Sequence, residues 1–98
     1  MYCISFDMTT TIFLKKFGTM LISRPAGREA WLAAQAYSLP EGTDSVVVDF
    51  AEVAVLSPSW ADEFLTPLRE RYGVENIKLQ HTENPSVIAT LETLKMSV

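Results

Sequence analysis

Three residues of the types used in acid–base and nucleophilic chemistry follow predicted strands. Asp49 closes an apolar run, Ser57 comes after a short turn, and His81 follows a second run. Histidine is the usual general base near neutral pH, so a Ser57–His81–Asp49 triad is one arrangement to weigh. No Gly-x-Ser-x-Gly pattern supports it, and turn or capping roles account for all three residues. A pairing of Cys3 with His81 is no stronger, because Cys3 lies in a regular alternating segment. We expect no catalytic site.

Metal and phosphate chemistry find equally little support. One histidine and one cysteine do not make the clustered ligand set of a zinc site. Asp49, Asp62 and Glu63 can approach one another, but two carboxylates at a helix start are typical of side chains that complement the helix dipole. No glycine-rich phosphate loop is present. We therefore expect neither a metal nor a cofactor.

These residues belong mostly to one stretch, Ser45–Tyr72, which predicts a strand, a turn and a helix. Val46–Val48 is an unbroken β-branched run, typical of a parallel strand that is buried on both faces. Ser57 can cap the first turn of a helix, and Pro58 suits the first helical position.

The helix after Pro58 has one apolar stripe and one polar face. Asp62, Glu63 and Thr66 are predicted to face outward, either as a docking surface for a basic patch on a partner or as a solvated helix face. Pro67 predicts a kink or a break, and Gly73 predicts the end of the helix. The stripe consists of Trp60, Phe64, Leu68 and Tyr72, flanked by Ala61 and Leu65.

The segment before this stretch is harder to assign. Alternating apolar residues predict a half-buried strand over Tyr2–Met8, and Thr9–Thr11 is expected to break it. Ile12–Phe17 is compatible with a second strand or with a single helical turn. Pro25 predicts a helix start, and Arg24 beside it suits a surface ion pair, a carbonyl cap or a partner contact. This helix is Ala-rich over Ala30–Leu39 and is predicted to end at Leu39-Pro40, with Trp31, Leu32, Ala36 and Leu39 on or near one side.

The last quarter of the chain predicts one more strand and one more helix. Ile77 and Leu79 alternate with polar residues, and Asn84–Pro85 repeats the cap-and-proline helix start. Strands that alternate with helices predict an α/β fold, with a small, mixed, mainly parallel sheet of about four strands and about three helices. The apolar face of the last helix is expected to hold Val87, Ile88, Leu91 and Leu94.

Composition narrows the functional classes. The chain has 98 residues, 48% hydrophobic and 20% charged, which is typical of one globular domain over residues 1–98. Its net charge of −4 and its isoelectric point of about 4.8 argue against binding to nucleic acid or to an anionic membrane. A single cysteine allows no internal disulfide, so we expect a cytoplasmic location. No signal peptide and no apolar run of the ~20 residues that span a bilayer are evident.

The stretch around Ser57 resembles the STAS family, which includes the bacterial anti-sigma factor antagonists, and more closely its STAS-like branch of unknown function. The family has a strand ending in Asp-Leu, a short hydrophobic passage, and Asp-Ser-Ser-Gly at the helix start. Here the strand ends in Asp49-Phe50, and Ser59-Trp60-Ala61-Asp62-Glu63 is similar to the Ser-Phe-Ala-Asp-Glu signature of the STAS-like branch. The order of the remaining elements agrees over most of the chain.

The resemblance implies regulation through protein contacts and no enzymatic activity. In anti-sigma factor antagonists, a kinase of the histidine-kinase-like ATPase fold phosphorylates the first serine of the motif. Here that position is Pro58, so only Ser57 or Ser59 remains as a substitute acceptor, and helix capping is the simpler role for Ser57.

We therefore predict a bacterial regulatory module that docks a histidine-kinase-like ATPase or an anti-sigma-like regulator. A homodimer is also compatible with the sequence, without an indication of where it forms. The alternative is a small-ligand or nucleotide-binding module, with a pocket lined by Asp49, Ser57, Ser59 and Arg24 at the ends of the strands. The predicted partner surface consists of Ser57, Ser59, Trp60, Asp62 and Glu63, with Arg24 as an addition.

Overall fold

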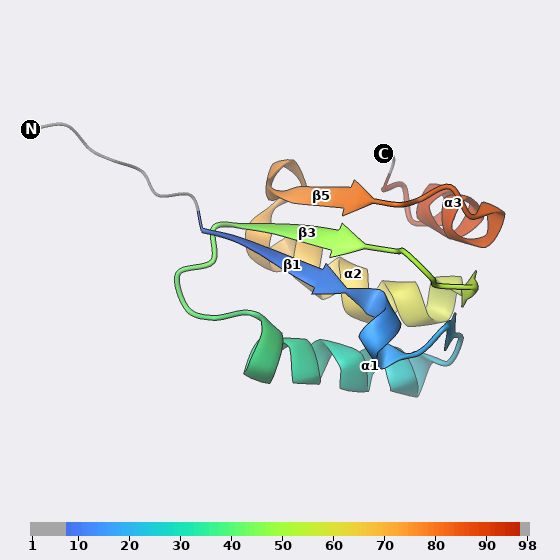
Figure 1. The fold of residues 1–98 in the computed structure, drawn as a ribbon, viewed down its shortest axis with the longest axis horizontal. Coiled ribbons are helices and arrows are strands. Elements are labelled where there is room, and N and C mark those ends of the chain that lie inside the picture. The colour runs from blue at the N-terminus through green and yellow to red at the C-terminus, as the bar shows by residue number, and fades with distance from the viewer. Residues whose placement is uncertain (1–7, 97–98) are drawn as a thin grey trace, which may run out of the picture.

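The computed structural model describes residues 8–96 and has an α/β architecture (Figure 1). The predicted strand over Tyr2–Met8 lies almost wholly outside the described residues. In chain order the elements are β1 (Thr9–Phe13), the 3-10 helix η1 (Leu14–Phe17), β2 (Met20–Leu21), α1 (Arg24–Ala33), the π-helical turn η2 (Ala34–Ser38), β3 (Ser45–Asp49), β4 (Val55–Leu56), α2 (Pro58–Tyr72), the 3-10 helix η3 (Val74–Asn76), β5 (Ile77–Gln80) and α3 (Pro85–Thr93).

The strands form two parallel sheets. One has the order β1–β3–β5, and the other joins β2 to β4. The predicted α/β class with mainly parallel strands is confirmed, although residues 8–96 hold five strands in two sheets where about four in one sheet were expected. Both crossovers of the larger sheet contain a helix, as parallel neighbours require.

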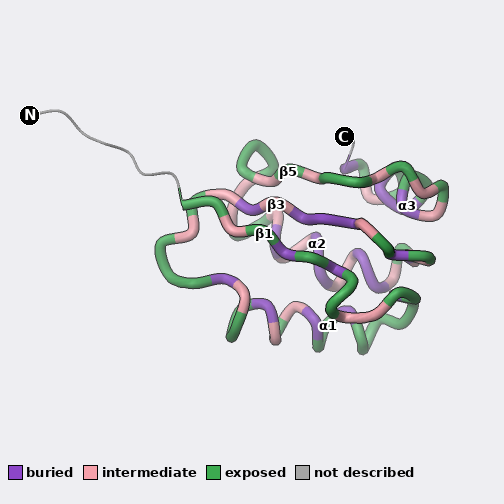
Figure 2. Tube along the Cα trace, in the orientation of Figure 1, coloured by how far each residue is buried: buried purple, intermediate pink, exposed green. Residues whose placement is uncertain are grey.

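Only one face of the larger sheet is buried by residues 8–96. Val46 and Val48 are 0% exposed, whereas Val47 between them is partly exposed. Helix α2 passes behind the strands with α1 beside it (Figure 1), and the buried part of the trace runs along β3 and the inner sides of these helices (Figure 2). The prediction that β3 is buried on both faces is therefore wrong. A β-branched residue fits a pleated strand whether or not its face is covered, so the run could not reveal this.

Strand β1 begins earlier than the sequence suggested. The expected break at Thr9–Thr11 is wrong, because these residues pair with β3 from Thr9 onward. Threonine is β-branched and suits a strand, and the Thr10 hydroxyl hydrogen-bonds the Thr43 hydroxyl at 2.9 Å. The two alternatives for Ile12–Phe17 are both realised in part, since the strand ends at Phe13 and η1 follows.

The core is centred on aromatic side chains between the helices and the sheet. Trp60 and Phe64 stack with ring centroids 5.1 Å apart. Trp31 meets Phe64 edge-on at 6.0 Å, and Phe17 contacts both Trp60 and Phe64. Such pairs add roughly 0.5–1.5 kcal/mol each beyond the area they bury.

Helix α1 approaches α2 through a glycine. Gly27 is buried, and a Cβ placed on it would lie 2.5 Å from the Trp60 carbonyl oxygen and 2.9 Å from the Trp60 Cα. Only a residue without a side chain fits, so the backbones of the two helices touch at this point.

The predicted start of α1 at Pro25 is confirmed, but its predicted inner face is only half right, since Leu39 is buried and Trp31 packs against the core whereas the other two residues do not. Leu32 is 53% exposed and Ala36 is also exposed, while Gly27, Ala30 and Ala34 are buried. The helix begins at Arg24 and is capped by Ser23. Its small residues, at spacings of three and four, face α2. In the sequence, the larger apolar residues had hidden this pattern.

Helix α2 runs unbroken through Pro67, so the expected break does not occur. Phe64 and Leu65 before the proline and Leu68 after it are all 0% exposed. This packing on both sides of the proline outweighs the one hydrogen bond that it removes. Gly73 ends the helix at a φ of 86°, and its N–H donates to the Arg69 carbonyl.

Helix α3 covers the edge of β4 with side chains. The Leu56 N–H donates to Ser86 Oγ at 3.0 Å, and the Thr90 hydroxyl donates to the Leu56 carbonyl. Asn84 caps the helix, as predicted, and its amide also donates to the carbonyls of Val53 and Ala54. These polar groups replace a neighbouring strand. The predicted apolar face of α3 is confirmed except for Ile88, which is 43% exposed.

Within residues 8–96, no helix combines the length and the apolar character needed to cross a bilayer.

Because of the contact at Gly27, we expect the stability of the protein to depend on the size of the side chain at this position. Gly27→Ala raises helix propensity by about 1 kcal/mol, but the added methyl group would overlap the Trp60 backbone and push the helices apart. We expect a net loss of about 1–3 kcal/mol in the free energy of unfolding, measured by urea denaturation. The matched control is Glu29→Ala, at an exposed position of the same helix, which should change stability by less than about 0.5 kcal/mol. Wild-type stability in Gly27→Ala would contradict the packing argument.

Candidate functional site

The predicted site residues gather where α1 and α2 begin. Ser57 is the N-cap of α2, with extended backbone, and its Oγ accepts from the Trp60 N–H at 3.1 Å. The same hydroxyl donates to the Ile22 carbonyl, and the Ser57 N–H donates to the Leu21 carbonyl at 2.9 Å. Ser57 therefore holds the start of α2 against the segment that leads into α1.

Ser59 lies in the first turn of α2 and is partly exposed. It precedes Asp62 by three residues and Glu63 by four, so all three side chains share one side of the helix. Ser59 is thus the serine of the motif that does not cap the helix.

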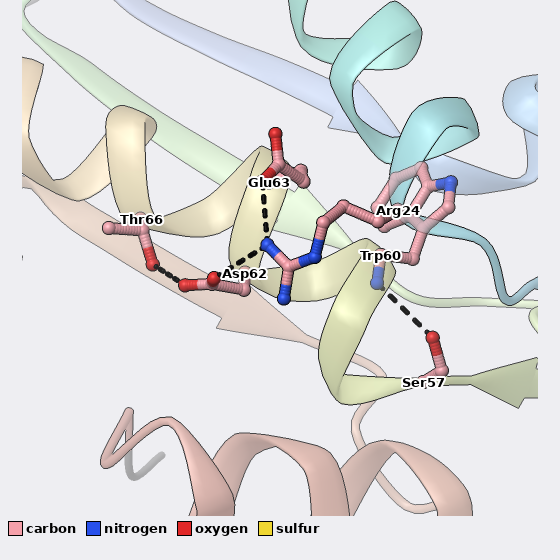
Figure 3. A network of polar contacts seen from close by, with 6 residues as sticks. All are labelled: Arg24, Ser57, Trp60, Asp62, Glu63 and Thr66. Carbon is pink, nitrogen blue, oxygen red and sulfur yellow. Dashed lines mark hydrogen bonds and ion pairs between the residues drawn. The ribbon is translucent and has the colours of Figure 1, made fainter.

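Arg24 joins α1 to both carboxylates of α2 (Figure 3). Its Nη1 donates to Asp62 Oδ2 at 3.0 Å and to Glu63 Oε2 at 2.6 Å. Figure 3 shows that both contacts leave from one guanidinium nitrogen, while the other terminal nitrogen points away from the two carboxylates. The cluster is solvent-accessible, with side chains 51% exposed at Arg24, 40% at Asp62 and 27% at Glu63.

The cluster shifts the pKa values of Asp62 and Arg24. The hydrogen bond from Thr66 to Asp62 and then the one from Arg24 hold the pKa of Asp62 below its ordinary value. Hydrogen bonds to Asp62 and then Glu63 raise the pKa of Arg24. Since all three side chains reach water, the ion pairs contribute little to stability.

This pairing changes the expected character of the surface. The sequence predicted a free acidic face, but Arg24 neutralises part of the charge of Asp62 and Glu63. Helices α1 and α2 together carry four acidic and four basic residues. A partner therefore meets a charged but balanced surface.

Trp60 cannot present its side chain to a partner. It is 1% exposed and stacks on Phe64 inside the core. Its inclusion in the predicted contact surface is corrected accordingly. The indole fills the space beneath α1 because a helix that starts at Pro58 points this position inward.

The pocket predicted from Asp49, Ser57, Ser59 and Arg24 is not assembled. Arg24 is committed to α2, and Asp49 pairs with His81 where β3 and β5 end. Ser57 donates its hydroxyl to a backbone carbonyl, so the triad weighed from the sequence is reduced to the Asp49–His81 pair. Cys3 lies outside the described residues.

The Asp49–His81 pair links the ends of two neighbouring strands. The Asp49 carboxylate is 7% exposed, and its Oδ1 lies 2.8 Å from His81 Nδ1 and accepts from the Ala51 N–H at 2.8 Å. His81 has a φ of 57°, a conformation that this pair helps to hold. No group of three or more potential metal ligands occurs among residues 8–96.

A shallow groove continues the Arg24 cluster along the two helices. Its volume is about 420 Å³. From the sequence, its exposed apolar residue, Leu32, was assigned to the inner side of the helix, and its basic residue, Arg28, was not considered. The signal that could have identified it is that Leu32 falls outside the three-and-four spacing of the small residues Gly27, Ala30 and Ala34. The groove is lined by Arg28, Trp31, Leu32, Asp62, Glu63, Thr66 and Pro67.

Comparison with known proteins identifies the family. A family model described as a STAS-like domain of unknown function matches residues 36–87, more than half of the chain. The chain belongs to this STAS-like family. The match includes the strand–turn–helix with Ser57, Ser59, Asp62 and Glu63, but not Arg24. A regulatory, anti-sigma factor antagonist-like fold follows from it. No curated protein and no solved structure matches the chain.

The two serines of the STAS-like domain should differ in their effect on stability. Ser57→Ala removes the N-cap and the bond to the Ile22 carbonyl, so we expect a loss of about 1–2 kcal/mol in the free energy of unfolding. Ser59→Ala, the matched control, should change it by less than about 0.5 kcal/mol. Urea denaturation of the three proteins tests this. Equal losses in both variants would refute the assignment of separate roles.

The lowered pKa of Asp62 predicts a dependence on pH. Its contribution to stability is present above the ordinary carboxyl pKa of 3.8 and is lost as the pH falls through the lower folded-state value. Wild type should exceed Asp62→Asn by less than about 1 kcal/mol at pH 7, and the difference should shrink below about pH 4. Urea denaturation at pH 7, 5 and 3 measures it, with Glu92→Gln on α3 as a control. A difference that stays constant down to pH 3 would contradict the linkage.

Proposed function

We propose that this STAS-like domain is a non-catalytic regulatory module that docks a protein partner at the start of α1 and α2. The observation that carries the proposal is the solvent-accessible cluster of Arg24, Asp62 and Glu63, which lies beside the capped start of α2. Charged, oriented side chains around a rigid helix start provide specificity for a partner.

The contact surface is narrower at the motif and longer along the helices than the sequence indicated. Trp60 is no longer part of this surface, because its side chain is buried. Ser57 contributes by capping the helix that carries the surface. The adjoining groove adds Leu32, an exposed apolar side chain that a partner can cover. A few apolar anchors inside a polar rim are the usual composition of a protein interface.

The partner class in this proposal is a histidine-kinase-like ATPase or an anti-sigma-like regulator in a bacterial cytoplasm. The support is the family's likeness to anti-sigma factor antagonists. Asp49 and His81 pair where β3 and β5 end, and the Ser57 hydroxyl donates to the Ile22 carbonyl instead of contacting them. This arrangement favours a binding role over hydrolysis.

Control of docking by phosphorylation falls on Ser59 in this proposal. Pro58 stands at the acceptor position of the family motif and has no hydroxyl, and the Ser57 hydroxyl is engaged at the cap. A phosphate on Ser59 would bring about two negative charges to the side of α2 that holds Asp62 and Glu63. It would repel the carboxylates and compete for Arg24, which changes the surface that the partner meets.

The proposal is tested by capture from the host lysate. The tagged wild-type protein should retain an ATPase or regulator of the proposed class, identified by mass spectrometry. Asp62→Arg should reduce the retained amount at least tenfold, because it places a second guanidinium beside Arg24 and removes the carboxylate that orients Arg24 toward a partner. Ser59→Asp should reduce it as well.

Two controls separate docking from folding. Glu92→Arg reverses an exposed charge on α3 and should retain the partner fully. The double variant Arg24→Asp with Asp62→Arg keeps an ion pair between the helices with reversed polarity, so it should fold yet lose the partner. The proposal fails if all variants retain the same proteins, or if wild type retains no regulator or ATPase.

A further inference from the structure

The outer edge of β1 offers backbone groups to another strand. The Met8 carbonyl accepts from the N–H groups of Asp44 and Ser45, at 2.8 and 3.3 Å, so it points toward β3. Backbone groups alternate in direction along a strand. Those of Thr9, Thr11 and Phe13 therefore point away from β3, and β1 has no strand on that side among residues 8–96.

Nothing in β1 discourages pairing at this edge. Its sequence, Thr-Thr-Thr-Ile-Phe, has no charged residue and no proline, and these are the usual means by which proteins protect an exposed edge. The opposite edge of the sheet is different, because β5 carries an exposed lysine at Lys78. Of the two edges, that of β1 is the one suited to accept a strand.

We infer that β1 pairs in an antiparallel manner with β1 of a second copy of this chain, about a two-fold axis at Thr11. Full overlap of the five-residue strand sets Thr11 opposite the partner's Thr11 and Thr9 opposite the partner's Phe13. These are the residues whose backbone groups point outward, so each opposed pair exchanges two hydrogen bonds. The two sheets become one sheet of six strands.

The side chains at this edge match in a self-paired arrangement. Threonine opposite threonine and threonine opposite an aromatic residue are favourable cross-strand pairs. No charge of β1 meets a like charge of the second copy, because β1 has none. A two-fold interface requires this kind of self-complementarity.

Exposed apolar side chains beside the edge extend the contact. Met8 is 46% and Phe13 is 52% exposed at the two ends of β1. Tyr37 is 89% exposed on η2, which packs beside β1. Five paired residues and these few side chains make a small interface, at the low end of the range for specific complexes. The dimer is accordingly weak and forms in the micromolar range.

Sedimentation velocity of the purified chain at protein concentrations from about 5 to 500 µM tests the inference. Wild type should shift from the monomer mass to twice that mass as the concentration rises. Thr11→Lys and Thr11→Glu should each remain monomeric, because two like charges would face each other across roughly 5.5 Å. A 1:1 mixture of the two variants should recover the dimer, since opposite charges then meet at the axis.

The recovery in the mixture distinguishes this register from any other mode of association. Thr11 is exposed, so circular dichroism should report the same fold for both variants. The matched control, Gln80→Lys, places a new lysine on β5 and should dimerise as wild type does. A wild-type monomer at all concentrations would overturn the inference, as would a dimer that persists in Thr11→Lys or fails to return in the mixture.

Discussion

The backbone contact between Gly27 and Trp60 determines how the rest of this domain is arranged. With 2.5 Å between a notional Gly27 Cβ and the Trp60 carbonyl oxygen, the two helices are as close as their backbones allow. The indole of Trp60 then has space only toward the core, where it stacks on Phe64. Arg24, one turn before Gly27, is brought to Asp62 and Glu63, just after Trp60. The charged cluster is thus a consequence of the apolar packing beneath it.

A second set of constraints fixes the start of α2. Ser57 hydrogen-bonds the helix it caps and also the strand end at Ile22. The Leu56 backbone before it is held by Ser86 and Thr90 of α3. The short pairing of β2 with β4 therefore acts as a joint between three helices. Residues on this joint are positioned precisely enough to serve as a binding surface because neighbouring elements hold them.

Features that depend on local chemistry were predictable from the sequence. The helix starts at Pro25, Pro58 and Pro85 rest on a capping side chain and a proline within a few residues. The parallel order followed from the alternation of strands and helices. Trp60 was correctly assigned to an apolar stripe, and its burial then excludes it from the contact surface.

Features that depend on distant residues were not predictable in this way. Arg24 and Asp62 are 38 positions apart, and only the close approach at Gly27 makes them neighbours. Asp49 and His81, 32 positions apart, are in contact as in the triad weighed from the sequence, but Ser57 does not complete that triad, and the pocket that joined Asp49 to Arg24 and the two serines is not assembled. The inner face of α1 was misassigned because glycine and alanine carry little hydrophobic signal, while the exposed Leu32 carries much.

The geometry of the cluster bears on how a partner can bind without disturbing the fold. Asp62 and Glu63 both use Nη1 of Arg24, and the other terminal nitrogen points away from them (Figure 3). A guanidinium has five N–H donors, so donors remain for an acidic group of a partner while the helix pair stays intact. A basic group would instead have to share carboxylates that are already paired. The docking surface is therefore better suited to an acidic group that bridges to Arg24 than to a basic patch that displaces it.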